Sequence, residues 1–132
     1  MANYLFEGGY KNQSGEVITQ IILLHFIDDK NIHFIYSPHL DLTGYGNSLQ
    51  EAKDSFTIVY EDFIDYTLTK NSLGVVLKEL GWEIKGTVKN PKKLKAPSMS
   101  EIIKTNNYVS EIFDNYPTVQ SSQQEVGLPV FA

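Results

Sequence analysis

The sequence contains no cysteine and no arginine among its 132 residues. Without cysteine the chain can form no disulfide, no thiolate metal site and no cysteine nucleophile. All 11 basic residues are lysines, so the chain lacks the guanidinium group that suits bidentate recognition of phosphate and guanine. This composition argues against a sequence-specific nucleic-acid reader, although an AT-rich genome would produce the same residue usage.

The sequence also lacks a long hydrophobic run. The longest extends from Ile21 to Ile27 and is interrupted by His25, whereas a membrane-spanning helix needs about 20 apolar residues. The N-terminal residues have neither the basic nor the apolar region of a signal peptide. We therefore expect a cytoplasmic protein that does not enter the membrane.

The residues that are present suffice for one folded domain, since 42% of the chain is hydrophobic and 12% is aromatic. We predict an α+β core over residues 1–90. Residues 91–132 are predicted to form a linker and a short helical or strand extension, packed on the core or on a partner subunit.

The first clear strand is predicted over Glu16 to Ile27, with apolar side chains on both of its faces. One face holds Val17, Ile21 and Leu23, and the other holds Ile18, Ile22, Leu24 and Phe26. Such a strand is typical of a sheet that is covered on both sides. We expect a long helix on one face, and either the C-terminal region or a second subunit on the other.

Two further strands follow a polar turn at residues 28–31. Ile32, Phe34 and Tyr36 are predicted to form the inner face of the second strand. The third is predicted over Leu40 to Tyr45, where Gly44 indicates a bulge or an edge. Tyr4 to Phe6 is an additional short strand candidate.

The clearest predicted element is a helix from Ser48 to about Thr69, because Ser48 and Glu51 have the spacing of a capping box. Apolar residues at spacings of three and four are expected to pack on the sheet: Leu49, Ala52, Phe56, Val59, Phe63 and Tyr66. A shorter helix is predicted after Asn71, with Gly81 as its left-handed stop. Trp82 to Val88 is then predicted as a fourth strand.

The remaining residues are predicted to be less regular. Lys89 to Pro97 has the composition of a linker. Ser98 and Glu101 have capping-box spacing and begin one or two short helices. Thr118 to Gln124 is polar and is predicted as a loop, and Val126 to Phe131 as a terminal edge strand, where Pro129 is tolerated.

Charge is distributed unevenly along the chain. Glu51 to Asp65 contains five acidic residues and one lysine, whereas Lys85 to Lys95 contains five lysines and no acidic residue. One interpretation is that each segment binds a partner of opposite charge. The other is that both are ordinary solvated surfaces.

The sequence offers no visible catalytic apparatus. A two-metal nuclease needs carboxylates on its central strands, but the strand from Val17 to Phe26 contains none. No nucleophile elbow or phosphate-binding glycine loop is present. His25, His33, His39 and Asp41 form a nominal metal set, but their spacing matches no metal motif. We therefore expect no enzyme activity, no cofactor and no bound metal.

The hairpin followed by a glycine turn and a capped helix resembles the HicB-type antitoxin family. The matching residues of the family's core motif are Pro38, Leu40, Gly46, Ser48, Glu51 and Ala52. The segment from Tyr66 to Trp82 is also similar to longer HicB-like chains. The chain departs from the pattern where the family commonly has a Gly-Cys pair, because Asp41 and Leu42 stand there.

This resemblance implies a partial RNase-H-like fold, in which a β-β-β-α-(α)-β sheet packs on one long helix. It also implies an oligomer that neutralises a small, basic, mRNA-cleaving toxin of the HicA type. Many members carry a C-terminal DNA-binding domain, but the C-terminal segment here has no convincing recognition helix. A solitary HicB-like oligomer and a nucleic-acid-binding regulator remain the alternatives.

Two sets of candidate binding residues follow from this interpretation. Partner binding is assigned to Leu40, Asp41, Tyr45, Asp54, Glu61, Asp62 and Asp65. Non-specific phosphate contact is assigned to Lys92, Lys93 and Lys95.

Overall fold

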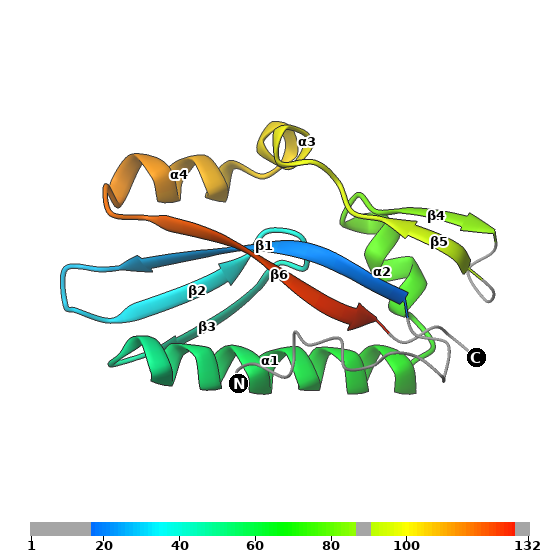
Figure 1. Cartoon of the computed structure of the whole chain (residues 1–132), viewed down its shortest axis with the longest axis horizontal. Helices are drawn as coiled ribbons and strands as arrows, with labels where there is room; N and C mark the ends of the chain where they lie inside the picture. The colour runs from blue at the N-terminus through cyan, green and yellow to red at the C-terminus, as the bar shows by residue number, and fades with distance from the viewer. Residues whose placement is uncertain (1–16, 87–90, 129–132) are drawn as a thin grey trace.

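A computed structural model describes residues 17–86 and 91–128 as a mixed α+β fold (Figure 1). The elements are β1 (Val17–Ile27), β2 (His33–Ser37), β3 (Leu42–Gly46), α1 (Leu49–Thr69), α2 (Leu73–Glu79), β4 (Glu83–Gly86), β5 (Pro91–Lys95), α3 (Met99–Thr105), α4 (Asn107–Asn115) and β6 (Gln120–Leu128). Four strands form an antiparallel sheet in the order β3-β2-β1-β6, and β4 pairs with β5 in a separate two-stranded sheet. The strand candidate at Tyr4 to Phe6 lies outside the described residues.

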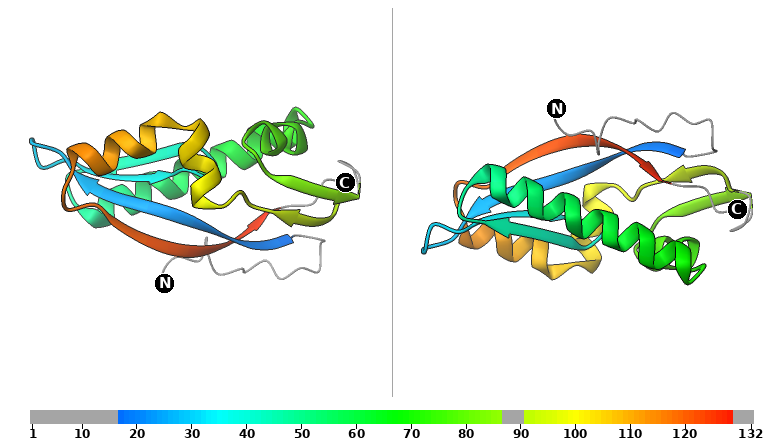
Figure 2. Two further views of the ribbon diagram at one scale, coloured as in Figure 1. Left: turned by 90° about the horizontal axis from the view of Figure 1, so that it is seen from above. Right: turned by 90° about the horizontal axis from the view of Figure 1, so that it is seen from below.

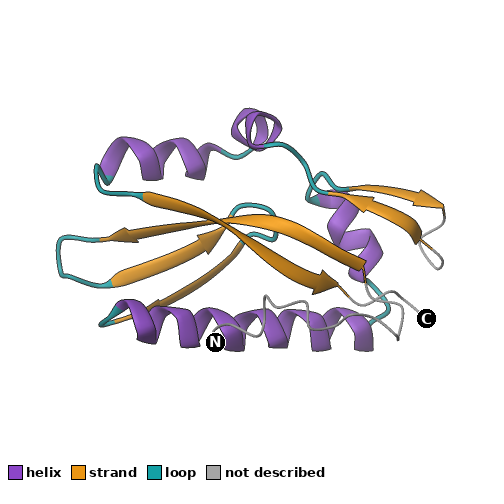
Figure 3. Ribbon diagram, in the orientation of Figure 1, coloured by secondary structure: helices purple, strands orange, loops and turns teal. Residues whose placement is uncertain are grey.

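The sheet is covered by helices on both faces, with α1 on one side and α3 and α4 on the other (Figure 3). On β1, Ile21 and Leu23 join the core beneath α1, whereas Leu24 and Phe26 join the core beneath α3 and α4. The predicted two-sided burial of β1 is thus confirmed. The C-terminal helices provide the second cover, so this face does not need a second subunit.

Strand β2 also contributes to both cores. Phe34 and Tyr36 pack on the α3–α4 side, while Ile35 is 4% exposed and packs on the α1 side. The prediction of a single inner face for this strand is therefore wrong. The turn before β2 is confirmed, because Asp28 accepts hydrogen bonds from the backbone N–H groups of Lys30 and Ile32 at 2.9 Å each.

The Ser48 hydroxyl caps the N-terminus of α1 as its sequence predicts, but the Glu51 carboxylate does not close the predicted capping box on the Ser48 N–H. The Ser48 hydroxyl accepts a hydrogen bond from the Glu51 N–H at 3.1 Å, and the Glu51 carboxylate accepts one from Asn47 N–H at 2.8 Å. The returning bond thus reaches the residue before Ser48, one position earlier than in a standard capping box.

The buried face of α1 is centred differently from the predicted stripe. Ala52, Phe56, Tyr60 and Thr67 are buried, whereas Leu49 and Tyr66 are exposed. Placing Leu49 and Tyr66 in the core was therefore wrong.

Strand β3 lies unusually close to α1. A side chain at Gly44 would overlap the backbone of Phe56, and one at Gly46 would overlap Glu51. Gly44 does lie on an edge strand, as predicted. The physical reason for both glycines is the close approach of the helix, which leaves no room for a β-carbon.

The helix α2 ends at Glu79, and Gly81 then adopts a positive φ of 97°, which confirms its predicted role as a stop. Trp82 is 3% exposed and joins the α1-side core with Leu77 and Leu94. The next strand, β4, pairs with β5 and not with the main sheet. Two predictions are corrected here: β4 does not extend the main sheet, and the supposed linker from Lys89 to Pro97 contains a strand.

The C-terminal region completes the main sheet. Ser98 and Glu101 form the predicted capping box of α3, and Asn106 separates α3 from α4. Strand β6 pairs with β1 from Gln120 opposite His25 to Leu128 opposite Val17. The predicted loop at Thr118 to Gln124 is therefore largely strand, and the predicted edge strand is confirmed up to Leu128. The domain boundary proposed at residue 90 falls between the paired strands β4 and β5.

Candidate functional site

The outer face of α1 is acidic. Helix α1 runs across the sheet (Figure 2, right), so the residues opposite its buried face are exposed to solvent. The acidic side chains among them belong to Glu51, Asp54, Glu61, Asp62 and Asp65, and Lys53 is the only basic residue within the helix. We call the four residues Asp54, Glu61, Asp62 and Asp65 the acidic face.

An apolar side chain lies within this acidic face. Ile58 is 59% exposed and is four residues from both Asp54 and Asp62, so the three lie along one ridge of the helix. The Asp54 carboxylate also accepts a hydrogen bond from the Gln50 amide at 2.9 Å. Sequence reasoning missed Ile58, although its position opposite Phe56 and Tyr60 on a helical projection would have revealed it.

The other predicted partner-binding residues do not join the acidic face. Leu40 is 2% exposed and lies in the α1-side core, so assigning it to a docking surface was wrong. Tyr45 is 63% exposed, and its ring contacts Phe34 with centroids 6.2 Å apart, on the α3–α4 side of the sheet. The predicted residues therefore occupy two opposite sides of the molecule.

Asp41 belongs to a polar network on the α3–α4 side. Its carboxylate accepts a hydrogen bond from the Tyr36 hydroxyl at 2.8 Å, and that hydroxyl accepts one from the Asn106 amide at 2.9 Å. Burial raises the pKa of Tyr36 well above its ordinary value. The network joins the β2–β3 turn to the junction of α3 and α4, and it holds Tyr36 in its neutral form.

His25 and His33 form a hydrogen-bonded pair on neighbouring strands. His25 Nε2 and His33 Nδ1 are 3.0 Å apart, and the two ring planes differ by only 11°. The ring centroids are 5.2 Å apart. With the two nitrogens 3.0 Å apart, the centroids can be this far apart only if both nitrogens lie nearly on the line between them, so the rings meet edge to edge and do not stack face to face. One ring must donate and the other accept. Burial, followed by the charge of His33, lowers the pKa of His25.

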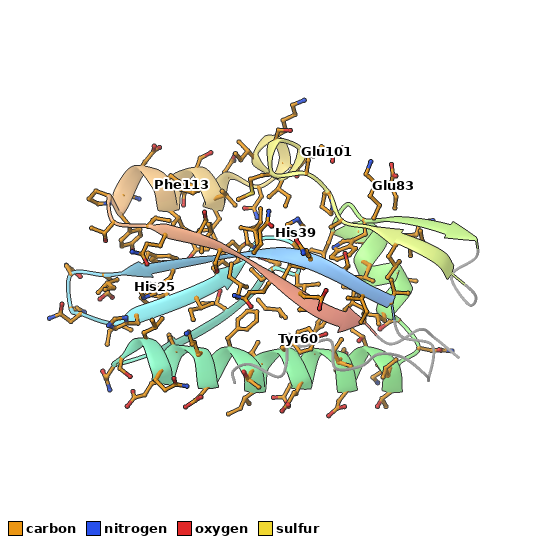
Figure 4. All side chains as sticks on the ribbon, viewed as in Figure 1. His25, His39, Tyr60, Glu83, Glu101 and Phe113 are labelled. Carbon is orange, nitrogen blue, oxygen red and sulfur yellow. The ribbon has the colours of Figure 1, made fainter. Side chains whose placement is uncertain are left out.

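His39 lies away from His25 (Figure 4). It uses both of its ring nitrogens. Nδ1 accepts a hydrogen bond from the Ile22 N–H at 3.1 Å, so Nε2 carries the proton and donates to the Pro97 carbonyl at 2.8 Å. Burial lowers the pKa of His39, which favours this neutral form. Its own carbonyl accepts a hydrogen bond from Trp82 Nε1 at 2.9 Å. His39 thus links β1, the segment between α2 and β4, and the residue that precedes the N-cap of α3.

The nominal metal set is not brought together. His39 and Asp41 each bond to groups far from the His25–His33 pair. Within residues 17–86 and 91–128, no group of three or more histidine or acidic side chains is arranged to hold a metal ion.

The predicted phosphate-contact lysines lie on the β4–β5 hairpin. Lys92, Lys93 and Lys95 are all in β5, where Lys93 is opposite Lys85 and Lys95 is opposite Glu83. Lys95 is exposed. The hairpin therefore concentrates basic residues at a different place from the acidic face.

A scan against protein-family models and searches of curated proteins and solved structures find no match to this chain. In the part of the chain that the structure describes, no helix has the length and apolar character needed to cross a membrane.

Proposed function

We propose that this protein is a non-catalytic, HicB-like binding module that neutralises a small basic toxin of the HicA type. In this proposal β1, β2, β3 and α1 form a partial RNase-H-like core, and the acidic face of α1 receives the partner. The order of these elements and the capped turn before α1 support the proposal. It places the protein in the cytoplasm, where such a toxin would act on mRNA.

The observation that carries the proposal is the acidic face with Ile58 inside it. Exposed carboxylates of one sign attract a basic protein and speed its diffusional encounter. An apolar side chain surrounded by charges provides the buried contact that slows dissociation once the partner has docked. Ile58 is 59% exposed, so a partner can bury it without any rearrangement of the helix.

The first experiment is affinity purification of the tagged protein from its native host, with intact-mass analysis of the co-eluting protein. We expect a stoichiometric small basic protein that cleaves mRNA alone and loses that activity in the complex. Recovery of this chain alone, or of a partner without ribonuclease activity, would contradict the antitoxin role.

A second experiment tests the proposed surface with the isolated pair. Neutralising Asp54, Glu61, Asp62 and Asp65 as amides should slow association at low salt, and Ile58→Ala should mainly speed dissociation. Glu111→Gln combined with Asp114→Asn, on α4, is the matched control and should change neither rate. Unchanged rates in the acidic-face variant would remove that face from the proposal.

The lysines on the β4–β5 hairpin favour a second candidate function, which is non-specific binding to nucleic acid. Lys85 lies opposite Lys93, and β5 adds Lys92 and Lys95. Such binding should weaken steeply as salt concentration rises. Duplex DNA binding with that salt dependence, in the absence of any toxin partner, would favour this role over the antitoxin role.

A further inference from the structure

The backbone groups of β6 alternate between those that face β1 and those that face outward, and two hydrogen bonds identify the outward set. Ile22 donates its N–H to His39, in the β2–β3 turn, so its backbone points away from β6. Ile22 is opposite Gln123, which makes this a pair without mutual hydrogen bonds. The backbone N–H and C=O of Gln123 therefore face outward.

The hydrogen bond at Gly127 agrees with this alternation. Its carbonyl oxygen accepts a hydrogen bond from the Tyr60 hydroxyl at 3.0 Å, as expected for a carbonyl that faces away from β1. Gly127 and Gln123 are four residues apart and have the same orientation in the strand. Ser121 and Glu125 have the same orientation as Gln123. Every second residue from Ser121 to Glu125 therefore presents its backbone N–H and C=O at the edge of the sheet. Their backbone groups have no backbone partner among residues 17–86 and 91–128.

The two edges of the sheet differ in how they are protected. At the β3 edge, the outward N–H of Tyr45 is capped by the Ser55 hydroxyl at 3.1 Å, and α1 lies against the strand. Strand β6 contains no lysine, no proline and no register shift, and Glu125 is its only charged residue. Proteins normally protect an exposed edge strand with such features. Among residues 17–86 and 91–128 no strand pairs with this side of β6, so the described edge can accept a further strand.

We propose that β6 pairs antiparallel with β6 of a second copy of this chain, about a two-fold axis at Gln123. In this register the three outward residues of one copy meet the three of the other. Ser121 lies opposite Glu125 of the second copy, where its hydroxyl can donate to the carboxylate, and Gln123 lies opposite its own equivalent. No like charges face each other across the pair, so two copies of this strand edge are complementary to each other.

This surface is separate from the acidic face proposed for the toxin, and the two proposals can fail independently. The paired strands join the two sheets into one continuous sheet of eight strands, without using Ile58 or the acids of α1. Because the contact is one strand wide, it buries a small area and the dimer should be weak.

Sedimentation velocity of the full chain over a concentration series tests the proposal. The native chain should dimerise, and Gln123→Pro should be monomeric because it removes an outward N–H but no bond to β1. Gln123→Ala is the matched control, since it keeps the N–H and should still dimerise. Equal urea unfolding of the three proteins would show that the fold is intact.

A cross-linking experiment tests the register. The chain has no cysteine, so Gln123→Cys carries a single thiol beside the proposed axis. Directly opposed, hydrogen-bonded residues have Cα atoms about 5.5 Å apart, within disulfide range. Oxidation should give a covalent dimer of Gln123→Cys, and none of the control Ser110→Cys on α4.

Three results would overturn the proposal. The first is a monomeric native chain at every concentration, and the second is a dimer that Gln123→Pro does not weaken. The third is a monomer in which the amides of Ser121, Gln123 and Glu125 are protected from hydrogen exchange, because another segment of the same chain would then pair with the edge.

Discussion

The hydroxyl of Tyr60 on α1 donates a hydrogen bond of 3.0 Å to the carbonyl oxygen of Gly127 on β6. The two residues are 67 positions apart in the chain. Tyr60 is 3% exposed, so this bond is made in the core. It attaches the long helix directly to the last strand of the sheet.

Removing this hydroxyl should destabilise the fold. Tyr60→Phe keeps the ring but leaves the Gly127 carbonyl without that donor, which should lower the free energy of unfolding by about 1–2 kcal/mol. Urea denaturation measures the change. Tyr66→Phe is the matched control, because Tyr66 is 63% exposed, and it should have almost no effect. Equal losses in the two variants would contradict the role of the buried bond.

Gly44 should tolerate no larger residue. A β-carbon there overlaps the Phe56 backbone, so Gly44→Ala must displace α1 from the sheet. We expect the free energy of unfolding to fall by about 3 kcal/mol or more, which is at the upper end of the range for overpacked sites. Gly81→Ala is a useful comparison, since it has space but a φ of 97° and should lose only about 1 kcal/mol. Thermal unfolding of both variants measures the two losses of stability. A larger loss for Gly81→Ala than for Gly44→Ala would contradict the prediction, because backbone strain would then cost more than overpacking.

The helix α4 should stabilise the second face of β1. Ile112 is 1% exposed and packs in the core with Leu24 and Phe26, so Ile112→Ala should lower the free energy of unfolding by about 2–5 kcal/mol. Its neighbour Phe113 is 47% exposed, and Phe113→Ala should lose less than about 1 kcal/mol. Chemical denaturation compares them, and similar losses would mean that α4 does not cover this face in solution.

Stability should depend on pH through His39. Its pKa in the folded state is below the ordinary value of 6.5 because of burial, so the unfolded chain binds the proton first as pH falls. The stabilising contribution is complete above about pH 6.5 and decreases as pH falls from there toward the folded pKa. Urea unfolding at a series of pH values should show this decrease.

The contribution of His39 can be separated from that of His25, whose pKa is also lowered by burial. His39→Gln and His25→Gln should each make the pH dependence shallower, and the double variant more so. An NMR titration of the native chain provides a second measurement. A His39 imidazole that takes up a proton above pH 6.5 would contradict the prediction.

Local sequence patterns were sufficient for the elements whose signals lie within one segment. The Ser48 cap, the Gly81 stop and the Asp28 turn each depend on a few neighbouring residues, and each forms as predicted. The alternation in β1 also revealed its two buried faces correctly. What this pattern could not identify was which part of the chain supplies the second cover.

The errors concern elements that distant partners stabilise. Residues 120–125 lack an apolar alternation because both of their faces are largely exposed, and pairing with β1 makes them a strand. The segment at Pro91 to Lys95 likewise depends on β4. Propensity and composition cannot reveal such pairing, since tertiary contacts override them.

The candidate site shows the same difference between features that local sequence predicts and features that distant contacts determine. The acidic face follows from helical periodicity, so the sequence was sufficient to predict that its four residues share the exposed side of α1. Leu40 was misplaced because a turn beside a strand usually lies on the surface. Here the turn is held in the core at His39, whose carbonyl oxygen accepts a hydrogen bond from Trp82 Nε1 at 2.9 Å.

The pairing of β1 with β6 also constrains how the chain folds. During synthesis β1 emerges first among the described strands and β6 last, and residues as distant as Val17 and Leu128 must meet. Such non-local pairing slows folding. The hairpin of β1 and β2 with β3 and α1 can form early on the ribosome, but one edge of β1 stays unpaired until the C-terminal strand is released. A nascent chain of this protein therefore leaves the β6-facing edge of β1 without its partner strand until residues 120–128 have been synthesised, and an unpaired strand edge favours association between incompletely folded chains.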